Sequence, residues 1–144
     1  MIEQDTIKLL RECDAGVKMG ISSIDDVLSR VEDDRLCKSL TECKNRHQLL
    51  SSELQRELKR FGDEGKNPNP VARSMSHMKT NAKLLANSSD STIAGLMTDG
   101  CNMGVKSLSR YLNEYQAADE WAKDAAKKLI RIEEDLSTEL RQYL

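Results

Sequence analysis

Hydrophobic residues recur every three or four positions along four long stretches of the chain, which is the spacing of one face of an α-helix. The first stretch can be capped by Asp5 or Thr6 and should end in the acidic turn at residues 32–34. The second should end at Phe61, because Gly62 follows where a left-handed cap favours glycine. The inward positions expected in these two helices are Leu9 or Leu10, Cys13, Val17, Ile21, Ile24, Leu28 and Val31, then Leu36, Leu40, Cys43, His47, Leu50, Leu54, Leu58 and Phe61. The pattern therefore predicts a helix hairpin.

The periodicity breaks between residues 62 and 70, where glycine, asparagine and two prolines replace the apolar positions. Pro68 and Pro70 lack a backbone donor, so a helix cannot continue through them and this stretch should be a linker. A shorter amphipathic run follows and closes at residues 87–90; its apolar positions are Val71, Met75, Met78, Ala82 and Leu85. We expect this run to form a crossover helix between two hairpins.

Two further long helices complete the pattern, one capped by Asp90 or Ser91 and ending near Tyr115, the other running to the C-terminus. The inward positions expected in them are Ile93, Leu96 or Met97, Gly100, Met103 or Gly104, Ser107 or Leu108, and Tyr111 or Leu112, then Ala122, Ala125, Leu129, Ile132, Leu136 and Leu140. Short connections within each pair and one long connection between pairs predict an all-α, antiparallel four-helix bundle. At 144 residues, one domain spanning residues 1–144 is expected.

A repeated motif indicates that the two hairpins arose by internal duplication. The pattern Gly-x-x-Met-Gly-aliphatic-x-Ser-aliphatic begins at Gly16 and again at Gly100, an offset of 84 residues. The segment 50–55 likewise resembles the segment 136–141, an offset of 86 residues. Two ordered matches at nearly one offset predict hairpins related by a pseudo-twofold axis.

The glycines of this motif need a structural reason, because glycine inside a helix costs about 1 kcal/mol relative to alanine. The pairs are Gly16 with Gly20 and Gly100 with Gly104. Small residues four positions apart leave room for a neighbouring backbone or a large side chain. We expect the first and third long helices to meet there, around the pseudo-twofold axis; a ligand groove is the functional alternative.

Several of these segments together resemble a known family. They are residues 9–16, the run 50–58 ending in Phe61 and Gly62, the linker, and the second Gly-x-x-Met-Gly hairpin. Over nearly its whole length the chain resembles a ferritin-like bacterial family of small four-helix proteins of unknown function, within the rubrerythrin and ferritin-like superfamily. The resemblance implies a ferritin-like bundle with a crossover and brings no established activity.

Ferritin-like iron proteins need an inward glutamate on two helices and a Glu-x-x-His pair on the other two. This chain has only two histidines, His47 and His77, and the residues three positions before them are Lys44 and Ser74. The inward positions of the first and third long helices hold Gly, Val, Met and Cys in place of glutamate. A di-iron centre is therefore not expected.

His47 is the one polar residue on the apolar face of its helix, between Cys43 and Leu50. By the 86-residue offset, its counterpart in the second hairpin is Glu133. One interpretation is a His–Glu hydrogen bond inside the bundle, or a degenerate metal site that includes Cys43. The other is that His47 lies at the edge of the core while Glu133 sits in water and the adjacent Ile132 fills the inward position.

Composition narrows the function classes. A net charge of −2 from 22 basic and 24 acidic residues provides no basic face for nucleic acid, and no long apolar run predicts a membrane span, so a cytoplasmic protein is expected. The four cysteines lack the Cys-x-x-Cys spacing of redox and zinc motifs. No catalytic triad order and no phosphate-binding glycine loop occur either.

Two hypotheses follow for the function. The first is a noncatalytic bundle without a cofactor that associates with itself or with an unidentified protein, through an exposed strip including the crossover methionines or Trp121. The second is a metal-binding or redox protein that uses His47, Glu133 and Cys43. No catalytic or cofactor-binding residue is predicted, and His77 is expected to be exposed.

Overall fold

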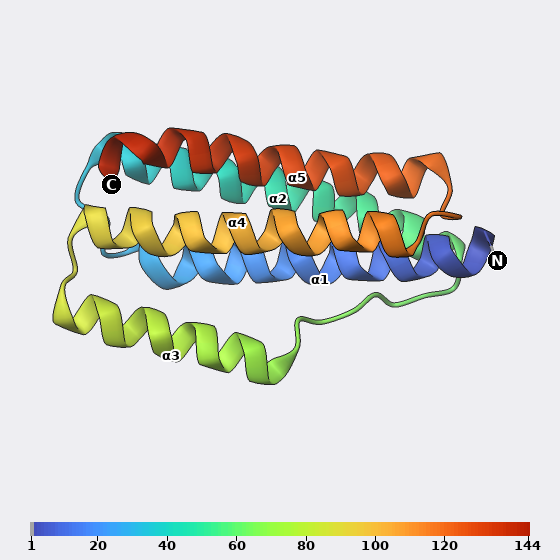
Figure 1. Cartoon of the computed structure of the whole chain (residues 1–144), viewed down its shortest axis with the longest axis horizontal. Coiled ribbons are helices and arrows are strands. Elements are labelled where there is room, and N and C mark those ends of the chain that lie inside the picture. Colours follow the sequence, from blue (N-terminus) through green and yellow to red (C-terminus); the bar gives the residue numbers. More distant parts are fainter. Residues whose placement is uncertain (1) are drawn as a thin grey trace.

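The chain folds into helices throughout the residues that the computed structural model describes, 2–144, and that range contains no strand (Figure 1). The five α-helices are α1 (Ile2–Leu28), α2 (Asp34–Arg60), α3 (Pro70–Ala86), α4 (Asp90–Glu114) and α5 (Glu120–Leu140), and a short 3₁₀ helix, η1 (Arg141–Tyr143), follows. The prediction of an all-α chain is confirmed. Among these helices none is both long enough and apolar enough to cross a membrane.

Four of the helices pack as two hairpins. α1 lies against α2 and α4 against α5, while contacts between α2 and α5 and between α1 and α4 join the two hairpins. The linker and α3 run back along the length of the bundle, so that α4 begins at the end where α2 began (Figure 1). α3 is the crossover helix that the sequence predicts between the hairpins.

The core is built almost wholly from aliphatic side chains contributed by all four bundle helices. Every inward position predicted for the last helix is buried in α5: Ala122, Ala125, Leu129, Ile132, Leu136 and Leu140. In α2 the predicted stripe is buried from Leu36 to Leu58, and the helix ends as expected before Gly62, which has φ +69°. Periodic apolar spacing was sufficient to identify the buried face of these two helices.

The predicted start of the first helix is wrong by one turn. α1 already begins at Ile2, so Asp5 and Thr6 lie inside it and are not its N-cap. Their side chains instead accept backbone hydrogen bonds from the turn before α5: Thr6 Oγ1 from the N–H of Asp119 at 2.8 Å, and Asp5 from the N–H of Ala117 at 3.1 Å. Capping residues can satisfy donors of a neighbouring helix as well as their own.

The end of the first helix also differs from the prediction. α1 stops at Leu28, and the acidic turn at residues 32–34 makes hydrogen bonds with α2 and α4 instead of ending α1. Asp33 is the N-cap of α2 and accepts from the N–H of Leu36 at 2.9 Å. The carboxylate of Asp90, in the first turn of α4, accepts from the N–H groups of Glu32 and Asp33 at 2.9 Å each. These bonds fix the start of α4 against the turn between α1 and α2.

The prediction that Gly100 faces inward is wrong. Gly100 is exposed, and a methyl group placed on it would meet no neighbouring atom within 4 Å. The inward position belongs to the next residue, Cys101, which packs with Met97 and Leu108 in the buried face of α4. Met103 is exposed as well. Because glycine and cysteine are both small, the sequence pattern did not distinguish these two adjacent positions.

The glycines of the repeated motif do not bring α1 and α4 together. A methyl group on Gly16 would lie 3.3 Å from Leu129 of α5, and the methyl positions of Gly20 and Gly104 point at side chains of α2 and α5. α1 and α4 do pack against one another, through their aliphatic positions. Three of the four glycines, Gly16, Gly20 and Gly104, therefore make room for side chains from the neighbouring helices.

Candidate functional site

His47 and Glu133 meet inside the bundle. His47 Nε2 lies 2.8 Å from Glu133 Oε1, joining α2 to α5. The His47 side chain is 1% exposed and that of Glu133 is 12% exposed. The hydrogen bond inferred from the 86-residue offset is confirmed, and the alternative that leaves Glu133 in water is wrong.

The partners of the imidazole determine its protonation. His47 Nδ1 lies 2.8 Å from the backbone carbonyl oxygen of Cys43, which can only accept, so Nδ1 carries a proton. Nε2 faces the Glu133 carboxylate, which also accepts. Burial alone would lower the pKa of His47, but hydrogen bonds with Cys43 and Glu133 and the charge of Glu133 outweigh it and raise the pKa to about 10. The pair is an imidazolium–carboxylate ion pair at neutral pH.

Glycines of the repeated motif make the space for this pair. A methyl group on Gly20 would lie 2.5 Å from His47 Nε2, closer than any real contact of that kind. At the corresponding position of the second hairpin, a methyl group on Gly104 would lie 3.6 Å from Glu133. The second glycine of each motif thus borders the polar residue of its own hairpin. The sequence pattern identified the glycines and the His–Glu pair separately and missed their connection.

Two of the buried thiols, Cys13 and Cys101, are poor nucleophiles. All four cysteines, which lie in the described part of the chain, are free thiols. Burial and the charge of Glu133 raise the pKa of Cys101 far above its ordinary value, and burial with the charges of Glu12 and Asp14 raises the pKa of Cys13 to about 12. Cys43 Sγ lies 3.6 Å from His47 Nδ1. Both thiols with raised pKa values stay protonated at neutral pH.

The donor set around His47 does not fit a metal ion. Both ring nitrogens carry protons that are donated to oxygen atoms, so neither lone pair is available as a ligand. Within residues 2–144 no group of three or more His, Cys, Asp or Glu side chains is arranged to hold a metal. Cys43 lies beside Nδ1 and Glu133 beside Nε2, so the three side chains of the metal hypothesis contact one another without converging on one metal position.

The second histidine connects the crossover helix to the bundle. His77 is exposed over about half of its side chain, as predicted, and its Nδ1 lies 3.0 Å from the Asp26 carboxylate of α1. His77 Nε2 lies 3.0 Å from the amide nitrogen of Asn81, which donates to it. The polar side of α3 therefore faces α1.

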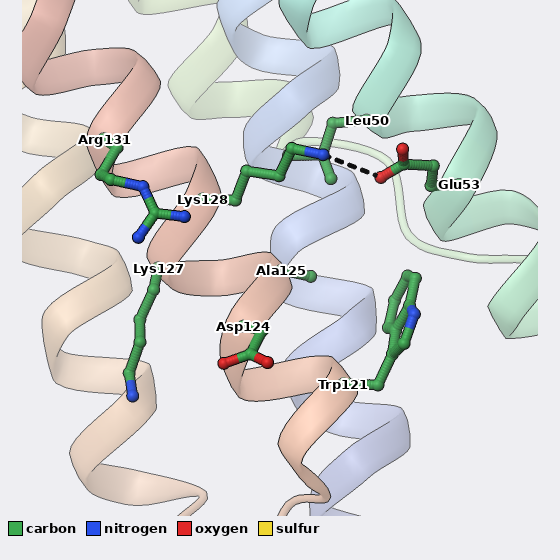
Figure 2. A pocket seen from close by; sticks show the side chains of 8 residues that line it. All are labelled: Leu50, Glu53, Trp121, Asp124, Ala125, Lys127, Lys128 and Arg131. Atoms are coloured by element: carbon green, nitrogen blue, oxygen red, sulfur yellow. Dashed lines mark hydrogen bonds and ion pairs between the residues drawn. The ribbon is translucent and has the colours of Figure 1, made fainter.

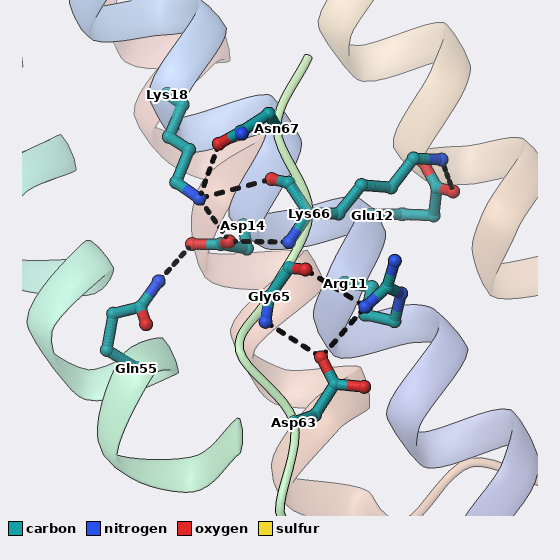
Figure 3. Close-up of polar contacts among 9 residues, drawn as sticks. All are labelled: Arg11, Glu12, Asp14, Lys18, Gln55, Asp63, Gly65, Lys66 and Asn67. Atoms are coloured by element: carbon teal, nitrogen blue, oxygen red, sulfur yellow. Dashed lines mark hydrogen bonds and ion pairs between the residues drawn. The ribbon is translucent and has the colours of Figure 1, made fainter. Parts of the chain in front are cut away.

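A second polar cluster, which the sequence did not predict, holds the linker on α1 (Figure 3). Asp14 is fully buried and accepts three hydrogen bonds. Its Oδ1 accepts from Gln55 Nε2 at 2.8 Å, and its Oδ2 accepts from Lys18 Nζ at 2.8 Å and from the backbone N–H of Lys66 at 3.0 Å. One carboxylate thus joins α1, α2 and the linker.

Neighbouring side chains extend this clamp along the linker (Figure 3). Arg11 donates to the Asp63 carboxylate and to the carbonyl oxygen of Gly65, both at 2.9 Å, and Lys66 pairs with Glu12. Gly65 has φ +93°, and a methyl group on it would lie 2.3 Å from the Asp14 carboxylate, so only glycine fits. The signal in the sequence was Asp14 itself, a charged residue next to the inward position Cys13.

Asp14→Ala should lower the free energy of unfolding by about 1 to 2 kcal/mol, because it leaves half-buried donors of Gln55 and Lys66 without an acceptor. Hydrogen exchange should accelerate at the Lys66 amide, and chemical denaturation measures the stability change. Glu64→Ala, an exposed change in the same linker, is the control and should stay within about 0.5 kcal/mol of wild type. Unchanged protection of the Lys66 amide in Asp14→Ala would show that the clamp does not hold the linker.

Trp121 borders a hollow of about 350 Å³ between α2 and α5 (Figure 2). The residues lining it are Leu50, Glu53, Trp121, Asp124, Ala125, Lys127, Lys128 and Arg131. Lys128 pairs with Glu53 at 3.3 Å beside the indole, whereas Lys127 and Arg131 point away from it (Figure 2). The cations do not converge on the tryptophan, so the hollow lacks the convergent polar groups of a small-molecule site.

Comparisons of the chain with protein-family models, with curated proteins and with solved structures find no significant match. The function therefore has to be argued from the surface and the site alone.

The exposed apolar surface is concentrated on the crossover helix. Of nine large hydrophobic side chains that are exposed in the described residues, four lie on α3: Val71, Met75, Met78 and Leu85. They are between 65% and 82% exposed. Together with the exposed Ala82 they form what we call the α3 stripe.

Proposed function

We propose that this protein is a noncatalytic helical bundle that acts by associating with protein, and that the α3 stripe is the association surface. The observation that carries the proposal is the exposure of the whole stripe on one face of one helix. Scattered exposed hydrophobic residues are ordinary, but a contiguous row of them on a soluble domain marks an interaction site.

The orientation of α3 supports this proposal. Leu84, the one buried side chain of this fully described helix, lies on the face opposite the stripe. His77 contacts Asp26 of α1, and Asn81 contacts His77. A helix that served only to cover the core would turn its apolar face inward. α3 does the reverse, and its apolar face is left for a partner.

We propose further that the frame is ferritin-like. Support comes from the order of the elements: two hairpins are joined by a crossover that runs the length of the bundle (Figure 1). Most buried positions of α1 and α4 hold apolar residues such as Val17, Ile24 and Ile93, and the one buried carboxylate there, Asp14, is bonded to the linker and α2. In this proposal the ferritin-like frame serves as a scaffold that displays α3.

The test compares a stripe variant with a matched control. Met75→Glu with Met78→Glu places two charges in the stripe, and Met103→Glu places one on α4 at a methionine that is equally exposed, 68% for both Met78 and Met103. Sedimentation at increasing protein concentration detects self-association, and selection from a displayed library of amphipathic helices without charge bias detects binding of other helices. We expect association by at least one measure, lost in the stripe variant and kept in Met103→Glu. Association that survives the stripe variant, or a wild type that associates with nothing, would overturn the proposal.

A further inference from the structure

We infer that the partner of the α3 stripe is an acidic amphipathic helix of another protein; this inference rests on the function proposed above. Charge is the first argument. Every charged residue between Glu64 and Asp90 is basic: Lys66, Arg73, Lys79 and Lys83. α3 itself carries three basic residues and no acidic one. Since the whole chain has a net charge of −2, the remainder carries −5. The apolar stripe therefore lies on the one α-helix of the described residues that carries basic residues and no acidic residue.

The spacing of the stripe fits a single helix as its ligand. The steps from Val71 through Met75, Met78 and Ala82 to Leu85 are four, three, four and three residues, the pattern of a coiled-coil seam. Such a seam is narrow, and knobs from one facing helix fill it. The 17 residues of α3 extend about 25 Å, so the ligand helix should have about five turns. Two methionines give the seam side chains that adapt to the partner.

The cations lie where they would contact the flank of that ligand. Lys79 and Lys83 are four residues apart, on one side of the stripe, while Ser74 and Asn81 line the other side without charge. Lys79 follows Met78 directly and is exposed, as is Lys83. Acidic residues along one edge of the ligand's own apolar seam would therefore pair with this flank.

Charge also disfavours two other occupants of the stripe, a second copy of this chain and an anionic membrane. Pairing of α3 with α3 of a second copy would bring two wholly basic helices together, with no carboxylate on either to offset the repulsion. An anionic membrane would attract α3 but repel the remainder of the chain, and the stripe has no aromatic residue of the kind that membrane-surface helices insert. An acidic helix contacts α3 alone and meets neither cost.

The experiment uses the full-length protein and two synthetic peptides of about five turns. Both carry the same apolar seam; one has glutamate and the other lysine at the flanking positions. Fluorescence anisotropy of the labelled peptides should show the glutamate peptide binding roughly tenfold more tightly, the effect of two ion pairs at the edge of an interface. The preference should shrink at high salt and reverse in Lys79→Glu with Lys83→Glu. Met78→Glu should abolish binding of the glutamate peptide, and Met103→Glu should leave it unchanged.

The remaining outcomes separate this inference from the proposed function. Equal binding of both peptides, lost in Met78→Glu, would overturn the acidic partner and keep protein association. Self-association that Met75→Glu with Met78→Glu removes, without binding of either peptide, would identify a second copy as the occupant and likewise overturn only the acidic partner. Binding only to vesicles that contain phosphatidylserine, or no binding at all, would overturn both.

Discussion

Glu133→Ala is expected to lower the free energy of unfolding by about 3 to 5 kcal/mol at neutral pH, the largest effect of any single change considered for this chain. Glu133 holds the charge that offsets the buried imidazolium of His47, 2.8 Å away. Without it, the hydrogen bond and the charge of Glu133 no longer oppose burial, so the pKa of His47 falls and Nε2 is left without an acceptor. Glu134→Ala is the matched control, because Glu134 is the exposed neighbour on the same helix, and it should change the stability by at most about 0.5 kcal/mol.

The same pair should give the wild type a distinctive pH dependence. The pKa of His47 is raised in the folded protein from 6.5 to about 10, so its contribution to stability is complete below pH 6.5 and is lost as the pH rises through this window. In the window the unfolded chain has released the proton that the folded chain keeps, and stability should fall by about 1 kcal/mol for each pH unit. The slope should become smaller in Glu133→Ala, where only the contacts of His47 with Cys43 still raise its pKa.

Denaturation curves collected between pH 6.5 and 8 test this, because cysteines with the ordinary pKa of 9.0 stay almost wholly protonated in that range and add little slope of their own. A wild type and a Glu133→Ala variant with parallel pH profiles would mean that His47 is neutral in the folded protein. Equal decreases in the free energy of unfolding of Glu133→Ala and Glu134→Ala would mean that the buried pair contributes nothing to stability.

Gly20→Ala should lower the free energy of unfolding by about 2 to 3 kcal/mol, although alanine is the better helix former by about 1 kcal/mol. The added methyl group would lie 2.5 Å from His47 Nε2 and 2.7 Å from Cδ2. The ring cannot move aside, because Cys43 holds one nitrogen and Glu133 the other. Either α1 shifts away from α2 or the ion pair breaks.

Gly104→Ala provides the comparison at the corresponding position of the second hairpin. Its methyl group would meet Glu133 at 3.6 Å, an ordinary contact, so the change should be neutral or stabilising by up to about 1 kcal/mol. Chemical denaturation of the two variants side by side measures the difference. If both glycines tolerate alanine equally, the imidazole is not held as tightly as its two hydrogen bonds indicate.

The fold followed from the sequence wherever one helical register was clearly better than its neighbours. In α5 a single set of residues, from Ala122 to Leu140, fits the apolar spacing, and that set is buried. In α4 the adjacent pair Gly100 and Cys101 offered two registers of nearly equal hydrophobicity, and the wrong one was favoured. Packing against α5 distinguishes them, and packing is not visible in a local pattern.

Only the part of the site that involves the repeated segments was predictable from the sequence. The 86-residue offset paired His47 with Glu133, but whether Glu133 turns inward beside Ile132 depends on the angle between α2 and α5. The Asp14 clamp had no counterpart in the second hairpin and escaped notice, because its partners come from a linker without periodicity. Periodicity also identified the apolar face of α3 correctly but could not tell whether anything covers it.

Two first hairpins assembled in the way that the first and second hairpins do would place two His47 rings together, without the carboxylate that accepts from Nε2 and raises the pKa of the ring. Two second hairpins would face the same problem with paired Glu133 carboxylates. Only unlike hairpins neutralise one another, through the contact at 2.8 Å. The ion pair thus favours assembly of the first hairpin with the second over assembly of two like hairpins.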